Sequence, residues 1–183
     1  VYKENLIVSN VKGDIFFSNL KDLKNFNQKE SNIKNFSIHD VLDIAIVNDY
    51  LFISSTYKKN LNDECTFFQI IFGKIESKNL QFENFYSSPQ CLKNTLGGRI
   101  IKFNGESENG ILVTLGASET EGYLAQKDDS AYGKILYFDI KTKEFKIFSK
   151  GHRNPQGLHF DGKNIISTEH GPYGGDEINK IIK

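Results

Sequence analysis

The stretch "GLHFDGKNIISTEHG" (Gly157 to Gly171) contains two short apolar runs separated by an Asp-Gly pair. Short runs rich in isoleucine and aromatic residues, bounded by Asn, Asp and Gly, are typical of β-strands. The Asp161-Gly162 pair tolerates the positive φ that tight hairpin turns require. The stretch therefore predicts two antiparallel strands joined by a turn.

The same order of strand, turn and strand recurs along the chain. "DIAIVNDYLFISST" begins at Asp43, and "RIIKFNGESENGILVTLG" begins at Arg99 with a turn at Asn104-Gly105. A weaker copy, "NLIVSNVKGDIFFSNL", begins at Asn5. The three full copies start at positions 43, 99 and 157, so their spacing is nearly constant.

Further pairs of strand-like runs fill the intervals between these copies. "TFFQIIFGKIES" and "LQFENFYSS" flank Lys78-Asn79, and "GKILYFDI" and "KEFKIFS" flank Lys141 to Lys143. Each unit of roughly 55 residues therefore holds about four strands, which is the signature of a β-propeller blade. A β-sandwich of hairpins is the alternative, but the regular period favours the propeller. No segment has a sustained 3.6-residue apolar period, so no long helix is expected.

We predict an all-β fold, a β-propeller of four-stranded blades, with about three to four blades in this chain. Propellers close with roughly 4–8 blades. The chain begins at Val1 and contains no methionine. We therefore expect residues 1–183 to be a single partial propeller domain, truncated at both ends.

The charge balance limits the classes of partner. Lysine plus arginine number 23, and aspartate plus glutamate also number 23. Nucleic-acid binders and membrane-surface binders usually carry a net basic face, so neither is expected. The chain has no apolar run near the roughly 20 residues that span a bilayer. Cys65 and Cys91 could form a disulfide in an exported protein or stay reduced thiols otherwise, and both alternatives stay open.

The candidate functional residues lie on both sides of the last hairpin. "GHRNPQG" (Gly151 to Gly157) precedes its first strand, and "TEHGPYGGDEIN" (Thr168 to Asn179) follows its second, so both loops should meet at one end of the blade. There Arg153 can bind a carboxylate in bidentate fashion, and Asn154 and His170 offer neutral hydrogen bonds. The carbonyl groups of Gly171 and Pro172 are ligands that suit calcium. The site would hold a planar polyanion together with a hard cation.

Two other interpretations of these loops remain open. His152 and Glu169 could serve only to satisfy backbone groups, because acidic and glycine-rich loops are common. A zinc site is a further alternative, although the spacing of its candidate ligands matches no zinc pattern. Those ligands would be His152, His170, Asp176 and Glu177.

The pair "GHRNPQGLHFD" and "TEHGPYGGDEIN" closely resembles the soluble quinoprotein sugar dehydrogenases of the glucose/sorbosone dehydrogenase family. "GGRIIKFNG", "ILVTLG" and "AQKDDSAYGKILYFDI" resemble the same family in the same order. The resemblance runs from about Val41 to Lys183 and is specific after Gly97.

The resemblance implies a six-bladed propeller that binds pyrroloquinoline quinone (PQQ) and calcium and oxidises the C1 hydroxyl of aldoses to lactones. It implies that Arg153 and Asn154 contact the quinone and that His170 lies beside its rings. It also implies that the carbonyls of Gly171 and Pro172 bind calcium. A sugar and an electron acceptor would be the partners, in the periplasm or outside the cell.

Two positions depart from the family pattern. The family has a histidine shortly before GGR, which acts as the general base, but here "NTLGGR" places Thr95 there. The nearest earlier histidine is His39. The family's "LGD" is here "LGA", so Ala117 replaces an acid that would support the base. Threonine accepts no proton near neutral pH, and a lost general base typically costs about 10²–10⁴ in rate. A non-catalytic binding or interaction module of the same ancestry is therefore the alternative to an active dehydrogenase.

Overall fold

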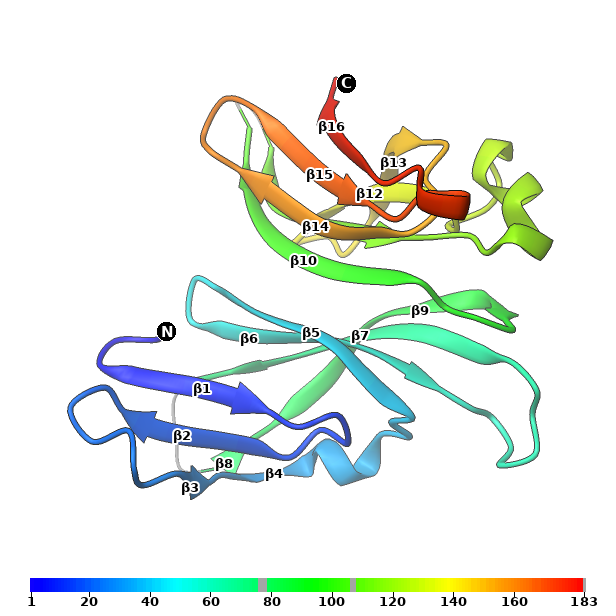
Figure 1. The fold of residues 1–183 in the computed structure, drawn as a ribbon. Coiled ribbons are helices and arrows are strands. Elements are labelled where there is room, and N and C mark those ends of the chain that lie inside the picture. Colours follow the sequence, from blue (N-terminus) through cyan, green and yellow to red (C-terminus); the bar gives the residue numbers. More distant parts are fainter. Residues whose placement is uncertain (76–78, 106–107, 183) are drawn as a thin grey trace.

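Antiparallel sheets follow one another along the chain in the order of the sequence repeats (Figure 1). The computed structural model describes residues 1–75, 79–105 and 108–182. Within these residues two sheets have four strands, and the sheets before and after them have three. The predicted all-β fold of propeller-type blades is confirmed.

In the two four-stranded sheets each strand pairs antiparallel with the next member of its sheet. One sheet contains β5 (Asp40–Val47), β6 (Tyr50–Tyr57), β7 (Thr66–Lys74) and β9 (Phe82–Leu92). The next contains β10 (Gly97–Asn104), β11 (Asn109–Leu115), β12 (Lys134–Asp139) and β13 (Phe145–Lys150).

The outer sheets are shorter. The first contains β1 (Asn5–Ser9), β2 (Ile15–Asn19) and β3 (Asn27–Gln28). The last contains β14 (Pro155–Phe160), β15 (Ile165–Glu169) and β16 (Glu177–Ile181). Short 3₁₀ helices lie between strands: η1 (Asn32–Asn35), η2 (Glu119–Gln126) and η3 (Pro172–Gly174).

One pairing was not expected from the sequence. β4 (Glu30–Ser31) and β8 (Asn79–Leu80) form a small parallel sheet, so the segment between β7 and β9 reaches the first blade. The expected turn at Lys78-Asn79 lies in part outside the described residues, because Lys78 is not among them. The local pattern gave no signal for this contact, which joins residues about 50 positions apart.

The two predicted glycine turns behave differently. Gly162 has a φ of 96°, and the side chain of Asp161 accepts the backbone N–H groups of Lys163 and Asn164, so this turn is confirmed. The Asn104-Gly105 hairpin also forms, but neither residue has a positive φ. Four residues separate β10 from β11, so the connection is longer than a two-residue turn, and residues 106–107 within it lie outside the described residues.

Hydrophobic cores lie between successive sheets, and alternate residues of a strand face opposite cores. Phe52 faces the core between the two four-stranded sheets, whereas Leu51 and Ile53 face the core on the side of the first sheet. β11 follows the same rule, since Val113 and Leu112 belong to different cores. These interlocking cores fix the positions of neighbouring blades.

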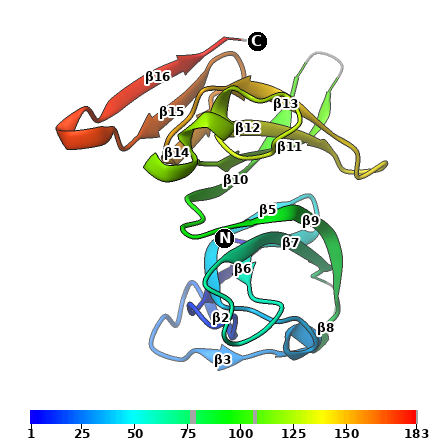
Figure 2. The same ribbon diagram turned by 90° about the vertical axis from the view of Figure 1, so that its right-hand side faces the viewer.

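The first strands of three sheets lie side by side, with β10 between β5 and β14 (Figures 1 and 2). Arg99 of β10 connects them: its Nη1 lies 2.8 Å from Asp43 Oδ1, and its Nε donates to the carbonyl of Gln156. The other carboxylate oxygen of Asp43 accepts the N–H of Ile100 at 2.9 Å. The beginnings of these strands are thereby held at one end of the molecule.

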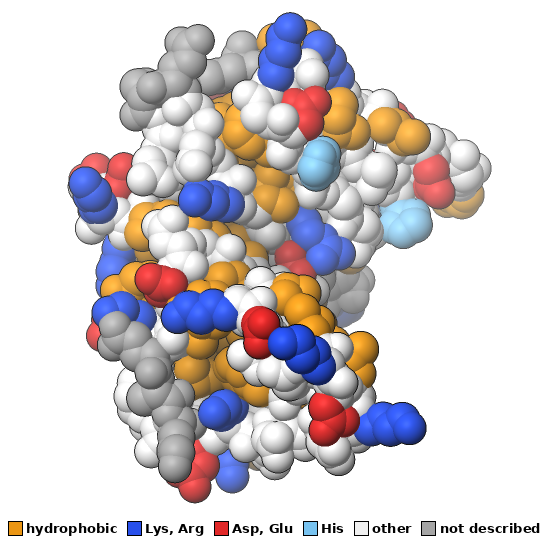
Figure 3. Space-filling view, turned by 90° about the vertical axis from the view of Figure 1, so that its left-hand side faces the viewer, with side chains coloured by type: hydrophobic (Ala, Val, Ile, Leu, Met, Phe, Trp, Pro, Cys, Tyr) orange, Lys and Arg blue, Asp and Glu red, His pale blue; other side chains and the backbone are white. Residues whose placement is uncertain are grey.

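The surface carries both signs of charge. On the face in Figure 3, acidic and basic side chains are interspersed rather than gathered into one patch of single sign. Within the described residues, no helix combines the length and the apolar character that a membrane crossing requires.

Candidate functional site

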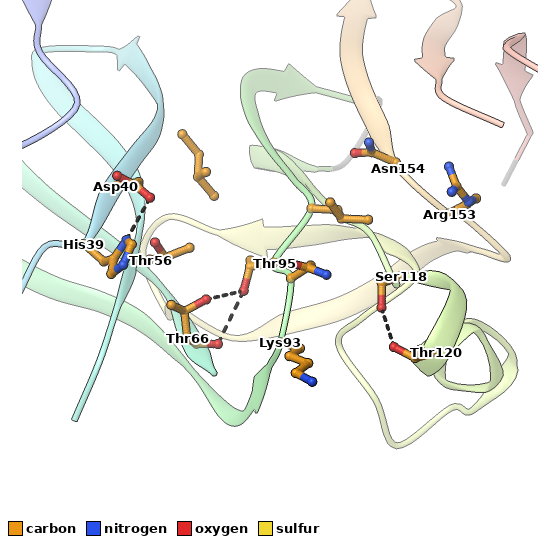
Figure 4. Close-up of a pocket in the computed structure, with 13 residues that line it drawn as sticks. His39, Asp40, Thr56, Thr66, Lys93, Thr95, Ser118, Thr120, Arg153 and Asn154 are labelled. Atoms are coloured by element: carbon orange, nitrogen blue, oxygen red, sulfur yellow. Dashed lines mark hydrogen bonds and ion pairs between the residues drawn. The ribbon is translucent and has the colours of Figure 1, made fainter. Parts of the chain in front are cut away.

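A cavity of about 660 Å³ opens where β5, β10 and β14 begin (Figure 4). Thr95, Arg153 and Asn154, three of the residues that the sequence singled out, line it. Its volume lies within the range of about 300–1,000 Å³ typical of small-molecule sites. The remaining polar lining consists of hydroxyl groups, one amide and titratable groups: Thr56, Thr66, Ser118, Thr120, Asn94, His39, Asp40 and Lys93.

The two loops of the last hairpin meet at this end of the blade, as the sequence predicted. Pro155 at the start of β14 pairs with Glu169 at the end of β15. The N–H of His170 donates to the carbonyl of Asn154 at 3.1 Å. Arg153 Nη1 donates to the carbonyls of His170 and Gly171 at 3.0 and 3.2 Å. Hydrogen bonds across the pair therefore fix the Arg153 loop to the Gly171 loop.

Glu169 stabilises this junction through hydrogen bonds to His152 and to the backbone of Arg153. Its side chain is buried, and its carboxylate accepts His152 Nδ1 at 2.9 Å and the backbone N–H of Arg153. Burial alone would raise the pKa of Glu169, but the hydrogen bonds from His152 and from the N–H groups of Arg153 and Asn154 outweigh it and lower that pKa. The carboxylate therefore stays ionised at neutral pH. Glu169 thus satisfies a backbone N–H, as one interpretation of the sequence expected, whereas the side chain of His152 contacts the side chains of Glu169 and Ser149.

The turn after β11 ties two walls of the cavity together. The N–H of Gly116 donates to the carbonyl of Leu96 at 2.9 Å, and the N–H of Ala117 donates to the carbonyl of Arg153 at 2.8 Å. Ala117 itself is buried in the core between the four-stranded sheets. The "LGA" segment therefore sets the separation between the Thr95 loop and the Arg153 loop through its backbone.

Thr95 is held by neighbouring strands and offers no basic group. Its Oγ1 lies 3.0 Å from Thr66 Oγ1 at the start of β7. Cys65, next to Thr66, forms a disulfide with Cys91 of β9, and their Cα atoms are 5.5 Å apart. Of the two alternatives for these cysteines, the structure contains the bridge, which anchors this wall of the cavity.

His39 and Asp40 line the same cavity, although sequence reasoning assigned neither to the site. Figure 4 shows them on one side of the opening, Arg153 and Asn154 on the other, and Thr95 between. His39 Nδ1 lies 2.8 Å from Asp40 Oδ2. The adjacent His-Asp pair at the start of a repeat was a usable signal, but it lies 56 positions before Thr95 in the sequence.

Three predicted residues lie at the rim on the Gly171 side. The carbonyl of Gly171 accepts Arg153 Nη1, and the carbonyl of Pro172 accepts the N–H of Gly175 at 3.1 Å. The side chain of His170 lines a second, smaller hollow, where its Nδ1 lies 3.5 Å from Asp176 Oδ1. The structure thus separates the imidazole of His170 from the cavity that contains Arg153 and Asn154.

The cavity fits an organic anion better than it fits an additional cation. Arg153 and Lys93 supply two positive charges against the single carboxylate of Asp40, and hydroxyl groups surround them. Calcium at Gly171 would share its carbonyl with a guanidinium, and the two positive charges would repel each other. In this arrangement Gly171 does not fit calcium unless Arg153 Nη1 first leaves that oxygen.

The zinc alternative is not assembled. His152 is occupied by Glu169 and by Ser149, whose Oγ lies 2.9 Å from Nε2. Across residues 1–75, 79–105 and 108–182, no group of three or more His, Cys, Asp or Glu side chains is placed to hold a metal ion.

The sequence model of the glucose/sorbosone dehydrogenases matches residues 4–183, almost the entire chain. The chain belongs to this family. A curated relative, quinoprotein glucose dehydrogenase B of Acinetobacter calcoaceticus, is 38% identical over 78 residues, which cover 35% of this chain and 16% of that protein. The family assignment agrees with the resemblance of the paired loop motifs.

Solved structures of dehydrogenases share the fold of this family member. The soluble aldose sugar dehydrogenase of Escherichia coli, solved in its apo form, superimposes with a TM-score of 0.71 at 21% identity. A structure of glucose dehydrogenase gives a TM-score of 0.74 at 19% identity. Each alignment covers 100% of this chain and 58% of the other, so the chain spans less than two thirds of these dehydrogenases.

Proposed function

We propose that this family member is an oxidoreductase domain that binds PQQ and calcium and oxidises aldoses at C1 to lactones. The observation that carries the proposal is the junction at Arg153, where a buried ionised carboxylate holds the backbone of the loop at the cavity wall. Preorganised cations at a cavity favour a ligand with several carboxylates. PQQ is such a ligand.

The roles of individual residues follow from their chemistry. Arg153 and Asn154 would bind carboxylate and carbonyl oxygens of the quinone, and Lys93 would add charge from the opposite loop. When bound, the quinone would supply the two-electron oxidant, with calcium as the group that polarises it. His170 would reach the quinone only if its ring turned from the second hollow toward the cavity.

Calcium binding at Gly171 and Pro172 would depend on the anion. A carboxylate placed near Arg153 would draw Nη1 away from the Gly171 carbonyl and leave that oxygen to calcium. Because two ligands that favour the same arrangement strengthen each other, calcium should bind at least about 5-fold more tightly when the quinone is present. Calorimetric titration of calcium with and without PQQ measures this coupling.

The compartment follows from the disulfide. Cystine bridges persist in oxidising environments and are rare in the cytosol. The Cys65–Cys91 bridge therefore favours a periplasmic or secreted protein. Mass spectrometry of the non-reduced protein taken from its native compartment tests this inference.

A non-catalytic binding module is the second candidate, and Thr95 and Ala117 favour it. The discriminating experiment reconstitutes the full-length protein with PQQ and calcium and follows dye reduction by glucose and other aldoses. Bound quinone with dye reduction supports the dehydrogenase, and bound quinone without dye reduction supports the binding module. If the protein neither binds quinone nor reduces the dye, both candidate functions are contradicted.

The variant Arg153→Ala tests the anion site directly. Truncating one partner of a buried charge pair costs about 2–5 kcal/mol, so we expect PQQ affinity to fall roughly 30-fold or more. Lys163→Ala removes a cation from the exposed turn at the far end of the same hairpin and should leave affinity unchanged. Equal affinities for both variants would remove Arg153 from the site.

A further inference from the structure

The His39-Asp40 pair occupies a defined place at the cavity wall. The N–H of His39 donates to the carbonyl of Thr56 at 2.7 Å, which fixes the backbone immediately before β5 against the end of β6. Asp40 is the first residue of β5 and pairs with Thr56. Lys12, from the loop between β1 and β2, donates to the His39 carbonyl at 2.6 Å. Backbone contacts on both sides therefore restrain the pair.

The hydrogen bond within the pair decides which ring nitrogen of His39 carries the proton. Burial raises the pKa of Asp40, but the hydrogen bonds from His39 and Lys12 outweigh burial and lower it, so Asp40 is ionised at neutral pH. An ionised carboxylate only accepts hydrogen bonds, so His39 Nδ1 must be the donor. In the neutral ring the lone pair then lies on Nε2.

The basic nitrogen belongs to a side chain that lines the cavity and is partly exposed. Within the described part of the chain, no hydrogen-bond partner of His39 Nε2 is found, and the side chain is 41% exposed. A carboxylate that orients an imidazole and stabilises its protonated form is the arrangement used by general bases. A surface His-Asp pair with a merely structural role would not need to line the cavity that Thr95, Arg153 and Asn154 share.

We propose that His39, oriented by Asp40, accepts the proton of a substrate hydroxyl in this cavity and takes the place of the base that Thr95 cannot provide. The inference rests on the proposed function. The O–H bond of the C1 hydroxyl breaks, its proton goes to Nε2, and its electron pair forms the C1=O bond. The hydride lost from C1 goes to an o-quinone as the two-electron oxidant. His39 is thus a catalytic residue, and Asp40 is a positioning residue.

The charged groups around His39 come from several elements. Asp40 lies on β5, Lys12 on the β1–β2 loop, Lys93 on the loop after β9, and Arg153 before β14. Asp40 carries the one negative charge among these four groups, and the other three are cations. Only Asp40 is in direct contact with the ring through a hydrogen bond, so replacing Asp40 should affect the proton-accepting state most.

The test uses the full-length protein loaded with PQQ and calcium. His39→Ala should lower kcat by about 10²–10⁴ with little change in KM or in quinone affinity, because the proton acceptor is lost and binding is not. Added imidazole should restore part of the rate, which a structural role would not allow. Asp40→Asn should lower kcat less than His39→Ala. His159→Ala, on the exposed side of β14, is the matched control and should retain full kcat.

A second readout needs no turnover. Nitrogen-15 NMR of the ring at a pH where it is neutral should show His39 protonated at Nδ1 and unprotonated at Nε2, and Asp40→Asn should reduce that preference. Full kcat in His39→Ala, or a proton on Nε2 in the unaltered protein, would overturn the inference while the proposed function stands. Absence of aldose oxidation by the unaltered protein would overturn the proposed function and this inference with it.

Discussion

Replacing Glu169 by glutamine should destabilise the protein and release the Arg153 loop. Glu169 is 8% exposed, and its carboxylate accepts the side chain of His152 and the backbone N–H groups of Arg153 and Asn154. Glutamine keeps the length of the side chain, but it replaces one carboxylate oxygen with an NH₂ group. Where that oxygen accepted a hydrogen bond, the NH₂ group faces the same donor. The change therefore removes the charge and leaves one donor unpaired.

The magnitude follows from these hydrogen bonds. Bonds to a charged group contribute about 1.5–3 kcal/mol each, and neutral bonds contribute about 0.5–1.5 kcal/mol. Loss of the charge from two bonds and loss of a third bond gives a decrease of about 3 kcal/mol in the free energy of unfolding. In a protein of this length, 1 kcal/mol corresponds to roughly 2–4 °C, so Tm should fall by about 6–12 °C.

The effect should also depend on pH in a defined direction. The folded-state pKa of Glu169 lies below its ordinary value of 4.5, so its contribution is complete above the unfolded-state pKa and is lost as the pH falls through the lower folded-state pKa. The difference in unfolding free energy between the unaltered protein and Glu169→Gln should be constant above about pH 6 and should shrink below about pH 4.5. Thermal unfolding by circular dichroism across this pH range measures it.

The matched control is Glu144→Gln, which removes a carboxylate from the exposed turn between β12 and β13. Its Tm should change by less than about 1 °C, since isolated surface charges contribute little. Equal Tm values for the two variants, or a difference for Glu169→Gln that does not shrink in acid, would refute the account of Glu169 as a buried, ionised support.

Two further changes test the walls of the cavity. Gly116→Ala would place a methyl group against the carbonyl of Arg153, so we expect a loss of about 1–3 kcal/mol in unfolding free energy. Gly122→Ala, in open space on η2, is the control and should cost nothing. Comparable losses at both positions would contradict the close approach of the two loops. Removing the bridge by Cys65→Ser together with Cys91→Ser opens a loop with a sequence separation of 26, which corresponds to about 3.5 kcal/mol of unfolding free energy. Chemical denaturation measures both changes, and an unchanged midpoint in the double serine variant would show that the bridge does not stabilise the protein by restraining its unfolded chain.

The sequence alone predicted the architecture, because strand and turn signals are local. The two apolar runs of "DIAIVNDYLFISST" predicted β5 and β6, and the Asp161-Gly162 pair predicted the turn between β14 and β15. The convergence of the Arg153 and Gly171 loops followed from the same logic, since the two ends of a hairpin must meet.

Only the tertiary structure brought His39 into the cavity and joined β4 to β8. It also turned the ring of His170 toward a separate hollow and engaged the Gly171 carbonyl with Arg153. These contacts link residues on different blades or loops, and they depend on the twist of each sheet and on the packing of the cores between sheets. The periodicity of a strand records which face of the sheet a side chain takes, but it does not record which distant segment lies opposite that face.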